Sequence, residues 1–346
     1  MEATSAYNLP VLNRLQEEGL HVSVINPLLM KKYASQTIRK GKTDKLDAIK
    51  IASYGIDNWY NLEDFQPRGE EYEELRLLGR QYSHYIRIKI EAMLGLTHLL
   101  DRTMPGIKRL LKWGQMEYPG KDKLTDFVEQ YWHYDTITDM GKEEFIRSYE
   151  KWTKERGYHP SESKAESIYS MAREGVPTLS SRTASTKMLV LEAVRVLREV
   201  TSALANILPQ MQVLAKGMQE YSVVRATPGV GAVLAPRLIA EIGDVRRFHS
   251  GSALVAYAGI DAPPFESGKF VGTQRRISKR GSPLLRKTGF EVMKCLKTVK
   301  PTEDAAVYNF MIKKESEGKP KKVAKIAALN KFLRIYYARV REVYQG

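Results

Sequence analysis

The sequence contains a single cysteine, Cys295, no run of about 18 apolar residues, and no charged start followed by an apolar leader. One thiol cannot form an intramolecular disulfide framework or a zinc site, which excludes disulfide-rich secreted domains and zinc fingers. Without a long apolar run or a leader, we expect neither a membrane span nor secretion. The sequence therefore predicts a cytoplasmic protein in which Cys295 is a buried structural thiol.

Acidic residues are scarce in the last part of the chain. From Tyr221 to the end, 24 lysines and arginines stand against 10 acidic residues, which accounts for +14 of the total charge of +15. Such a local excess is typical of a polyanion-binding domain, because each neutralised phosphate releases counterions. An acidic membrane would instead favour a basic amphipathic helix with Trp or Phe on its apolar face, a pattern not evident here. Nucleic acid is the predicted partner, and no membrane is expected.

The remaining composition indicates a globular protein of two or three domains, since 346 residues with 43% hydrophobic content can bury substantial cores. Apolar spacing predicts one helix over about 67–103 and a second over 185–217. Two such helices suit either a coiled coil, within or between chains, or an ordinary helix-bundle core. The predicted fold class is mainly α with an α/β part, divided into residues 1–66, 67–221 and 222–346.

The first 66 residues predict helix, strand and helix in turn. "AYNLPVLNRLQEEGL" has helical spacing, "HVSVINP" is a short β-branched strand, and the following segment resumes helix to about residue 55. Asp44 and Asp47, in "GKTDKLDAIK", stand three residues apart at the start of helical spacing. They suit a capping-box variant, or they place two carboxylates on one helix face where hard oxygen donors bind Mg²⁺. Glu2 is a candidate third carboxylate.

The basic domain opens with a turn motif. Pro228-Gly229-Val230-Gly231 joins two predicted helices and resembles a helix-hairpin-helix, in which glycines expose backbone N–H groups to a phosphate. A plain packing corner between two helices is the alternative.

A run of six cations without any acidic partner follows the turn motif, which favours phosphate contact over a solvated charged face. The cations are Arg275, Arg276, Lys279, Arg280, Arg286 and Lys287. Just before them, Ser267 lies beside a glycine in a predicted loop, and the residues around it do not form a hydrolase triad motif.

Several of these motifs occur together in one known family. "EATSAY", "EEGLHVSVINP" and "KTDKLDAIKIA" near the start, with "TPGVGAVLAPRLIAEIGDVRRFHSGSALVAYAGIDAPPFESGKF" and "RRISKRGSPLLRK" later, resemble the DEDD transposases of the one-ten insertion-sequence family. These are RNA-guided "bridge" recombinases, and the resemblance covers nearly the whole chain. It implies an incomplete RuvC-like, RNase H-type N-terminal domain, a coiled-coil middle and a helical C-terminal transposase domain.

The resemblance also implies a chemistry. It assigns metal-binding carboxylates to Glu2, Asp44 and Asp47, with Mg²⁺ or Mn²⁺ as cofactor, and the nucleophile to Ser267. The serine would attack a DNA phosphodiester and hold the cut end until the strands are rejoined. A noncoding guide RNA, DNA and a homodimer or homotetramer are the implied partners.

The sequence departs from the family at its start. The family's first aspartate lies on a strand upstream of the glutamate, and no residue here matches it; Ser5 stands where the family more often has Gly. The resemblance therefore implies an N-terminally truncated chain that lacks three strands and one metal ligand, and we expect poor activity. A catalytically defective remnant that still binds DNA or RNA is the alternative reading, and a structure-specific nuclease that cleaves without rejoining is a third.

Overall fold

A computed structural model describes residues 1–3, 7–35, 43–66, 69–114, 121–263, 266–267, 270–271 and 276–345, those at 266–267 and 270–271 by their backbone. The chain divides into two compact units, residues 1–68 and 69–346, and each is treated by itself. Both units are mainly helical, which confirms the mainly α prediction. Within the described ranges, no helix is long and apolar enough to cross a membrane.

The first unit is built from short helices. They are α1 (Leu9–Glu17), α2 (Pro27–Ala34), α3 (Asp44–Asp57) and the 3-10 helix η1 (Trp59–Asn61). Asn26 caps α2 by accepting a 2.9 Å hydrogen bond from the Leu28 N–H, and proline follows the cap at the first helical position. The helical segment predicted after "HVSVINP" is present as two helices, α2 and α3, and the predicted helix start at Asp44 is confirmed. Residues 36–42 lie outside the described residues.

Two extended segments of the first unit, at Glu2 and at Ile25, pair with each other through one β-bridge. Glu2 forms an isolated parallel bridge with Ile25, supported by bonds from Ala3 N–H to the Ile25 carbonyl at 2.9 Å and from Ile25 N–H to the Met1 carbonyl at 2.8 Å. The predicted strand in "HVSVINP" is thus present as a single bridge and not as a regular strand. Parallel pairing needs a crossover, and here α1 supplies it.

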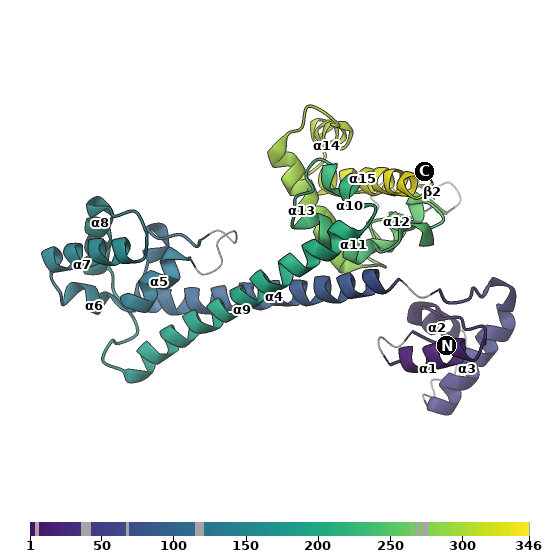
Figure 1. Cartoon of the computed structure of the whole chain (residues 1–346), viewed down its shortest axis with the longest axis horizontal. Coiled ribbons are helices and arrows are strands. Elements are labelled where there is room, and N and C mark those ends of the chain that lie inside the picture. Colours follow the sequence, from purple (N-terminus) through teal and green to yellow (C-terminus); the bar gives the residue numbers. More distant parts are fainter. Residues whose placement is uncertain are drawn as a thin grey trace. The chain divides into compact units, whose positions relative to one another are not determined.

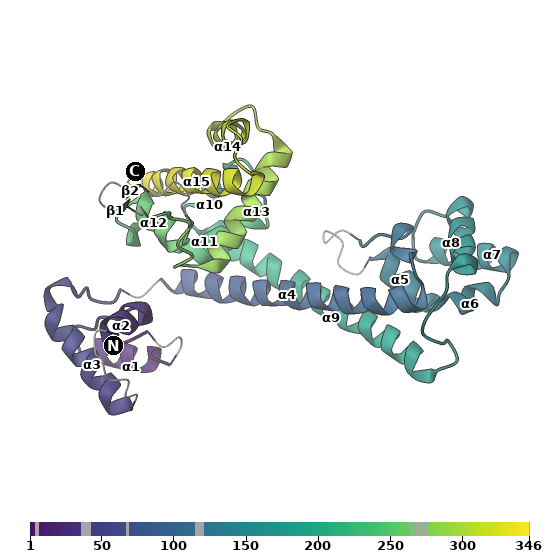
Figure 2. The same cartoon turned by 180° about the vertical axis from the view of Figure 1, so that it is seen from behind.

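The second unit begins with two long helices that enclose a helical insertion. Its elements up to the second long helix are α4 (Glu70–Thr103), η2 (Ile107–Arg109), α5 (Lys123–Gln130), α6 (Tyr134–Thr138), α7 (Lys142–Glu155), α8 (Glu162–Glu174) and α9 (Ala184–Gly217). Figures 1 and 2 show α4 and α9 running antiparallel and crossing each other. Both long helices therefore form as predicted and pack within one chain.

The rest of the second unit is a helical domain with a small hairpin. Its elements are α10 (Tyr221–Ala226), α11 (Leu234–Ile242), η3 (Val245–Arg247), α12 (Gly251–Tyr257), β1 (Glu266–Ser267), β2 (Phe270–Val271), α13 (Pro283–Val299), α14 (Ala306–Ser316) and α15 (Lys321–Val343). Every residue of α11 is buried, so this helix is the centre of the domain. The prediction of a buried thiol is wrong, because Cys295 on α13 is exposed.

Two hydrophobic cores lie at opposite halves of the long helices. The first half of α4 and the second half of α9 pack with α10–α15, through residues that include Leu75, Tyr82, Leu204 and Met211. The other halves pack with α5–α8, through residues that include Leu96, Leu100, Val190 and Leu197. Each long helix thus has an apolar face along most of its length. Both cores depend on apolar side chains from both long helices.

A buried carboxylate joins three distant parts of the second unit. Glu220, which is almost inaccessible to solvent, accepts hydrogen bonds from Tyr72 Oη at 2.7 Å and from Tyr344 Oη at 2.5 Å. The two hydroxyls lie 2.8 Å apart. Burial and the hydrogen bond to the Glu220 carboxylate raise the pKa of Tyr344 to about 12. The start of α4 and the end of α15 are thereby fixed to the residue that precedes α10.

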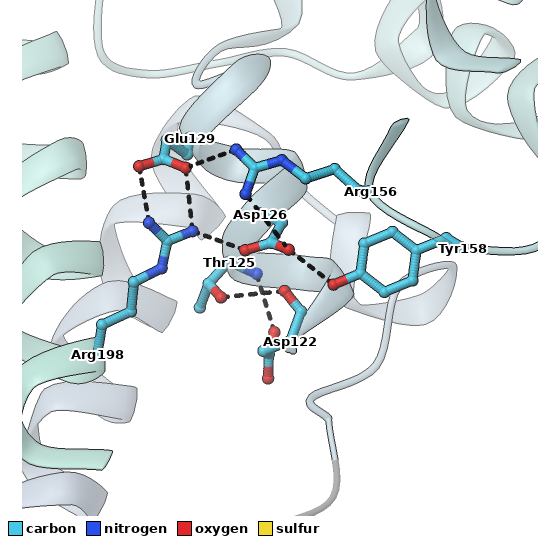
Figure 3. Close-up of polar contacts among 7 residues, drawn as sticks. All are labelled: Asp122, Thr125, Asp126, Glu129, Arg156, Tyr158 and Arg198. Atoms are coloured by element: carbon cyan, nitrogen blue, oxygen red, sulfur yellow. Dashed lines mark hydrogen bonds and ion pairs between the residues drawn. The ribbon is translucent and has the colours of Figure 1, made fainter. Parts of the chain in front are cut away.

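A charged network attaches α5 to α9 (Figure 3). Arg198 binds both carboxylate oxygens of Glu129, at 2.7 and 3.1 Å, and reaches Asp126 at 2.7 Å. Arg156 bonds to the same Glu129 at 3.2 Å, and the Tyr158 hydroxyl donates to Asp126 at 2.7 Å. Asp126 is buried, so its charge needs these partners, and charge-assisted bonds of this kind are among the stronger ones.

This network predicts a pH-dependent contribution to stability. Hydrogen bonds from Arg198, aided by the charges of Arg198 and Arg156, hold the pKa of Glu129 below its usual range. The carboxylate therefore stabilises the fold above its unfolded pKa of about 4.5, and this effect is lost as the pH falls through the lower folded pKa. Because solvent screens the pair, we expect Glu129→Gln to cost about 1 kcal/mol at pH 7, a few degrees of Tm.

Thermal unfolding of the wild type and the variant from pH 7 to pH 3 measures this effect. The difference in Tm should shrink as the pH falls below the unfolded pKa of the carboxyl group, because the carboxylate begins to bind protons there. Glu192→Gln is the matched control, because Glu192 pairs with Arg195 on an exposed part of α9 and should leave Tm unchanged at every pH. A difference between wild type and Glu129→Gln that is as large at pH 3 as at pH 7 would contradict the assignment.

Candidate functional site

The two aspartates predicted as metal ligands lie in the first turn of α3. The Thr43 side chain caps this helix by accepting from the Leu46 N–H at 3.2 Å, so Asp44 is the first helical residue and not the cap. Asp44 is exposed and Asp47 is half-buried. Residues three apart share one helix face, so both carboxylates lie where a hard cation could bind them. Lys50 Nζ lies 3.2 Å from Asp47 Oδ1.

Glu2 lies in the same unit, on the extended segment that pairs with Ile25. In the parts of the chain that the structure describes, no group of three or more Asp, Glu, His and Cys side chains is arranged to hold a metal ion. Asp44 and Asp47 supply oxygen donors of the type that Mg²⁺ prefers, but two carboxylates by themselves do not complete its coordination. Glu2 is not brought into one group with them.

Ser267 belongs to the second unit and ends the short strand β1. This strand pairs antiparallel with β2, with Glu266 opposite Val271 and Ser267 opposite Phe270. The predicted loop is thus a two-stranded hairpin (Figure 2).

The segment that carries this hairpin is closed at its base. Asp261 precedes it and Ser278 follows it. The Ser278 N–H donates to the Asp261 carbonyl at 2.8 Å, and the Ser278 hydroxyl donates to Asp261 Oδ1 at 2.5 Å. Next along, the Lys279 N–H donates to the Gly259 carbonyl at 3.0 Å. The ends of the serine-bearing segment are therefore held together, and the basic run starts at this junction.

Most of the basic run is exposed and free of acidic partners. Arg276, Lys279, Arg280 and Lys287 are exposed, and none of them takes part in an ion pair with another described residue. Like charges without counterions on one surface are typical of a phosphate-binding site. Arg275 lies outside the described residues.

Arg286 differs from the other cations of the run. It is half-buried, and its Nη1 donates to the Ala258 carbonyl at 2.9 Å, so part of its function is to hold the basic segment against the residues after α12. Ser282 completes this attachment by capping α13 and donating to Glu241 on α11 at 2.8 Å. The sequence analysis missed Ser282, although a serine before a proline at a helix start is a recognisable cap signal.

The glycine turn lies between α10 and α11, as predicted, but its two glycines have different surroundings. Gly229 has φ +83°, and a Cβ there would lie 3.0 Å from the backbone nitrogen and Cβ of Leu296 on α13. Gly231 faces open space. Gly229 is therefore a close packing point, which agrees with the alternative interpretation of the motif as a packing corner. At Gly231 the adjacent space is open, and phosphate contact there stays a prediction.

A cavity of about 700 Å³ opens elsewhere in the second unit, between α4, α9 and the start of α5. Its lining includes Lys89, Trp113, Thr125 and Arg198. Asp122 shapes one wall, because it caps α5 through the Thr125 N–H at 2.9 Å (Figure 3). None of the residues predicted for the functional site lines this cavity.

Comparison with known protein families shows which family these parts of the chain resemble. Residues 221–308 match the model of the transposase IS116/IS110/IS902 family, and residues 1–105 match a transposase model of the DEDD type from IS110. The two matches cover more than half of the chain. They include the aspartates of α3, the glycine turn, Ser267 and the basic run.

Relatives along the full chain agree with these matches. The pilin gene-inverting protein of Moraxella lacunata is 25% identical over 342 residues, which span 99% of this chain and 79% of the relative. Its counterpart in Moraxella bovis is 24% identical over the same spans. An uncharacterized 44.8 kDa protein of insertion element IS116 from Streptomyces clavuligerus is 22% identical over 68% of this chain and 57% of its own length.

The matched domains define a DNA transposase, an enzyme of transposition and recombination that binds DNA. The chain belongs to the IS116/IS110/IS902 transposase family.

The two glycines of the turn should differ in how strongly an added side chain destabilises the second unit. A Cβ at Gly229 would be strained by the positive φ and by the contact with α13, so Gly229→Ala should destabilise the second unit by about 1–3 kcal/mol. Gly231→Ala has free space and should leave stability nearly unchanged. Denaturant unfolding of both variants measures this difference. Equal stability losses for the two variants would contradict it.

Proposed function

We propose that this transposase cuts and rejoins DNA through a phosphoserine intermediate at Ser267. The oxygen of the serine hydroxyl would attack the phosphorus of a phosphodiester, and the bond from that phosphorus to one deoxyribose oxygen would break. The leaving oxygen takes a proton and becomes a free hydroxyl. Attack by a hydroxyl of another strand on the phosphoserine then restores the serine, so the number of phosphodiester bonds is conserved.

The observation that carries this assignment is the closed base of the serine-bearing segment. Asp261 and Ser278 join its ends, and exposed cations that form no ion pair with another described residue begin at Arg276, two residues before Ser278. A nucleophile for a phosphodiester needs positive charge nearby, because the phosphate carries negative charge and repels an attacking oxygen. The segment 276–280 can supply that charge from its fixed position.

We infer that Asp44 and Asp47 bind the divalent metal that a DEDD transposase domain suggests. Glu2 would join them as a further ligand only if metal binding moved it, because the structure does not group it with the two aspartates. Mg²⁺ or Mn²⁺ suits these hard oxygen donors. When bound, such an ion would stabilise negative charge that develops on phosphate oxygens. Lys50 already pairs with the Asp47 carboxylate, so a bound metal ion would compete with this lysine for the carboxylate oxygens.

We infer further that the first unit is RuvC-like and that the enzyme works as a dimer or tetramer with a noncoding guide RNA. A parallel pairing at Glu2 and Ile25 with α1 as the crossover supports the RuvC-like assignment. Exposed apolar side chains on the long helices support coiled-coil contact with a second copy, among them Leu77, Leu94 and Val213. Base pairing by the RNA would supply sequence specificity, since lysine and arginine contacts to phosphate do not.

Covalent trapping tests the role of Ser267. The protein would be incubated with Mg²⁺, with supercoiled DNA carrying the sequences that flank its own gene, and with RNA transcribed from those flanks. We expect a protein–DNA adduct that resists denaturation and maps to Ser267 by mass spectrometry. Ser267→Ala should abolish the adduct and reduce strand exchange by at least about 10³-fold, as loss of a nucleophile does. Ser222→Ala, at an exposed position of α10, is the control.

Other outcomes of this experiment have distinct meanings. An adduct that persists in Ser267→Ala would refute the assignment of the nucleophile. Cleavage without an adduct or rejoining would indicate a structure-specific nuclease. DNA and RNA binding with neither cleavage nor adduct in the wild type would indicate the catalytically defective remnant.

Metal binding can be tested without turnover. Mn²⁺ binding, followed by electron paramagnetic resonance or calorimetry, should weaken by about 10–100-fold in Asp44→Asn/Asp47→Asn, because two anionic ligands are removed. Glu17→Gln, which alters an exposed carboxylate on α1, is the matched control. The same Mn²⁺ affinity in the double variant and the wild type would exclude these aspartates as ligands.

A further inference from the structure

The aromatic ring of Phe290 on α13 brings two lysines together. Lys294 Nζ, about one turn further along α13, lies 5.5 Å from the ring centroid, and Lys325 Nζ on α15 lies 5.6 Å from it. The face of an aromatic ring attracts a cation, so the ring holds both ammonium groups in place. These two charges are therefore no further apart than the sum of the two distances.

Close packing between α13 and α15 makes this arrangement possible (Figure 2). Gly289 precedes Phe290, and a Cβ at Gly289 would lie 2.5 Å from Leu329 Cδ1 on α15. The absence of a side chain at Gly289 allows the two helices to approach until Lys325 reaches the ring.

The acidic residue that follows Phe290 already has another partner. Glu291 binds Arg237 at 2.6 Å. In the described parts of the chain, neither Lys294 nor Lys325 forms an ion pair. Two like charges that contact one aromatic ring without a counterion repel each other, and an anion bound beside the ring would offset this repulsion.

A second ring in the same domain provides an internal comparison. Phe310 on α14 has Lys314 Nζ 5.4 Å and Lys331 Nζ 5.1 Å from its centroid. There, however, Lys314 also binds Glu317 at 2.7 Å. The two sites share the same cation–aromatic geometry, but the site at Phe310 has its own counterion, and among the described residues the site at Phe290 does not.

The pair at Phe290 is continuous with other exposed cations. Lys287 lies one turn before Phe290 on α13, and Lys321 and Lys322 lie one turn before Lys325 on α15. Lys287 and Lys294 are seven residues apart, about 10 Å along the helix, which matches about three base-pair rises of 3.4 Å along the axis of a DNA duplex. Positive charge thus continues from the basic run along α13 to the start of α15.

We propose that Lys294 and Lys325 bind the phosphodiester backbone of duplex DNA and that Phe290 is the residue that positions them. DNA is the favoured partner, because α13 lies within the residues that match the transposase family model. This surface extends the phosphate-binding role proposed for residues 276–287 and rests on that proposed function. Lysine contacts to phosphates set the position of a duplex without reading its sequence.

DNA binding by Lys294→Gln/Lys325→Gln tests this surface. Fluorescence anisotropy would follow the binding of the full chain to a labelled duplex of arbitrary sequence at several salt concentrations. For each phosphate that a lysine no longer neutralises, the slope of log K against log salt should become shallower by about 0.9, so the double variant should change by about 1.8. At about 0.1 M salt, affinity should fall by at least about tenfold for every duplex sequence.

Three further variants make the result specific. Lys314→Gln/Lys331→Gln removes the same charge from the ring site that has Glu317 and should leave the slope nearly unchanged. Lys294→Arg/Lys325→Arg keeps the charge and should retain the wild-type slope. Phe290→Leu keeps both lysines but not the ring, so affinity should fall about two- to fivefold without a change in slope. Circular dichroism would verify that each variant is folded.

The outcomes separate this inference from the function on which it rests. If the wild type binds duplex DNA and the double glutamine variant has the same slope as the wild type or as the Phe310-site control, the inference is overturned. If the wild type does not bind duplex DNA at all, the proposed function fails with it. If the weakening occurs with single-stranded RNA and not with duplex DNA, the surface binds RNA and the assignment to DNA is wrong.

Discussion

The antiparallel packing of α4 and α9 is the constraint on which the second unit depends. Each helix contributes one half of its apolar face to the core with α10–α15 and the other half to the core with α5–α8. Neither core is complete without both long helices. A change in the register between α4 and α9 would therefore move apolar side chains in both cores at once, because interiors are close-packed.

Polar contacts fix what the apolar packing leaves free. Glu220 joins the start of α4 to the end of α15 through two tyrosine hydroxyls, and Asp126 joins α5 to α9 through Arg198. Both carboxylates are buried, so the removal of a partner would leave a charge without compensation. A polar contact also holds the segment that carries Ser267, since Asp261 and Ser278 join the two ends of that segment.

Local signals in the sequence were sufficient for the long helices, because the 3.6-residue spacing predicted α4 and α9. The run of cations predicted phosphate contact, which stays a prediction; four of these cations are exposed. The same signals failed where tertiary contacts decide. Thr43 and not Asp44 caps α3, the predicted strand before Pro27 is a single bridge, and Cys295 is exposed. Residue type alone does not reveal which side of a helix faces a neighbour.

The sequence by itself determined the charge distribution, the helix periodicities and the motifs by which the chain is similar to transposases, because these depend on residue types and their spacing. Only the tertiary structure separated Gly229, packed against Leu296, from Gly231, which faces open space. Only the structure brought Lys325 to the ring of Phe290 beside Lys294. Those relations join residues far apart in the chain, and they arise from the packing of one helix on another, which no local pattern specifies.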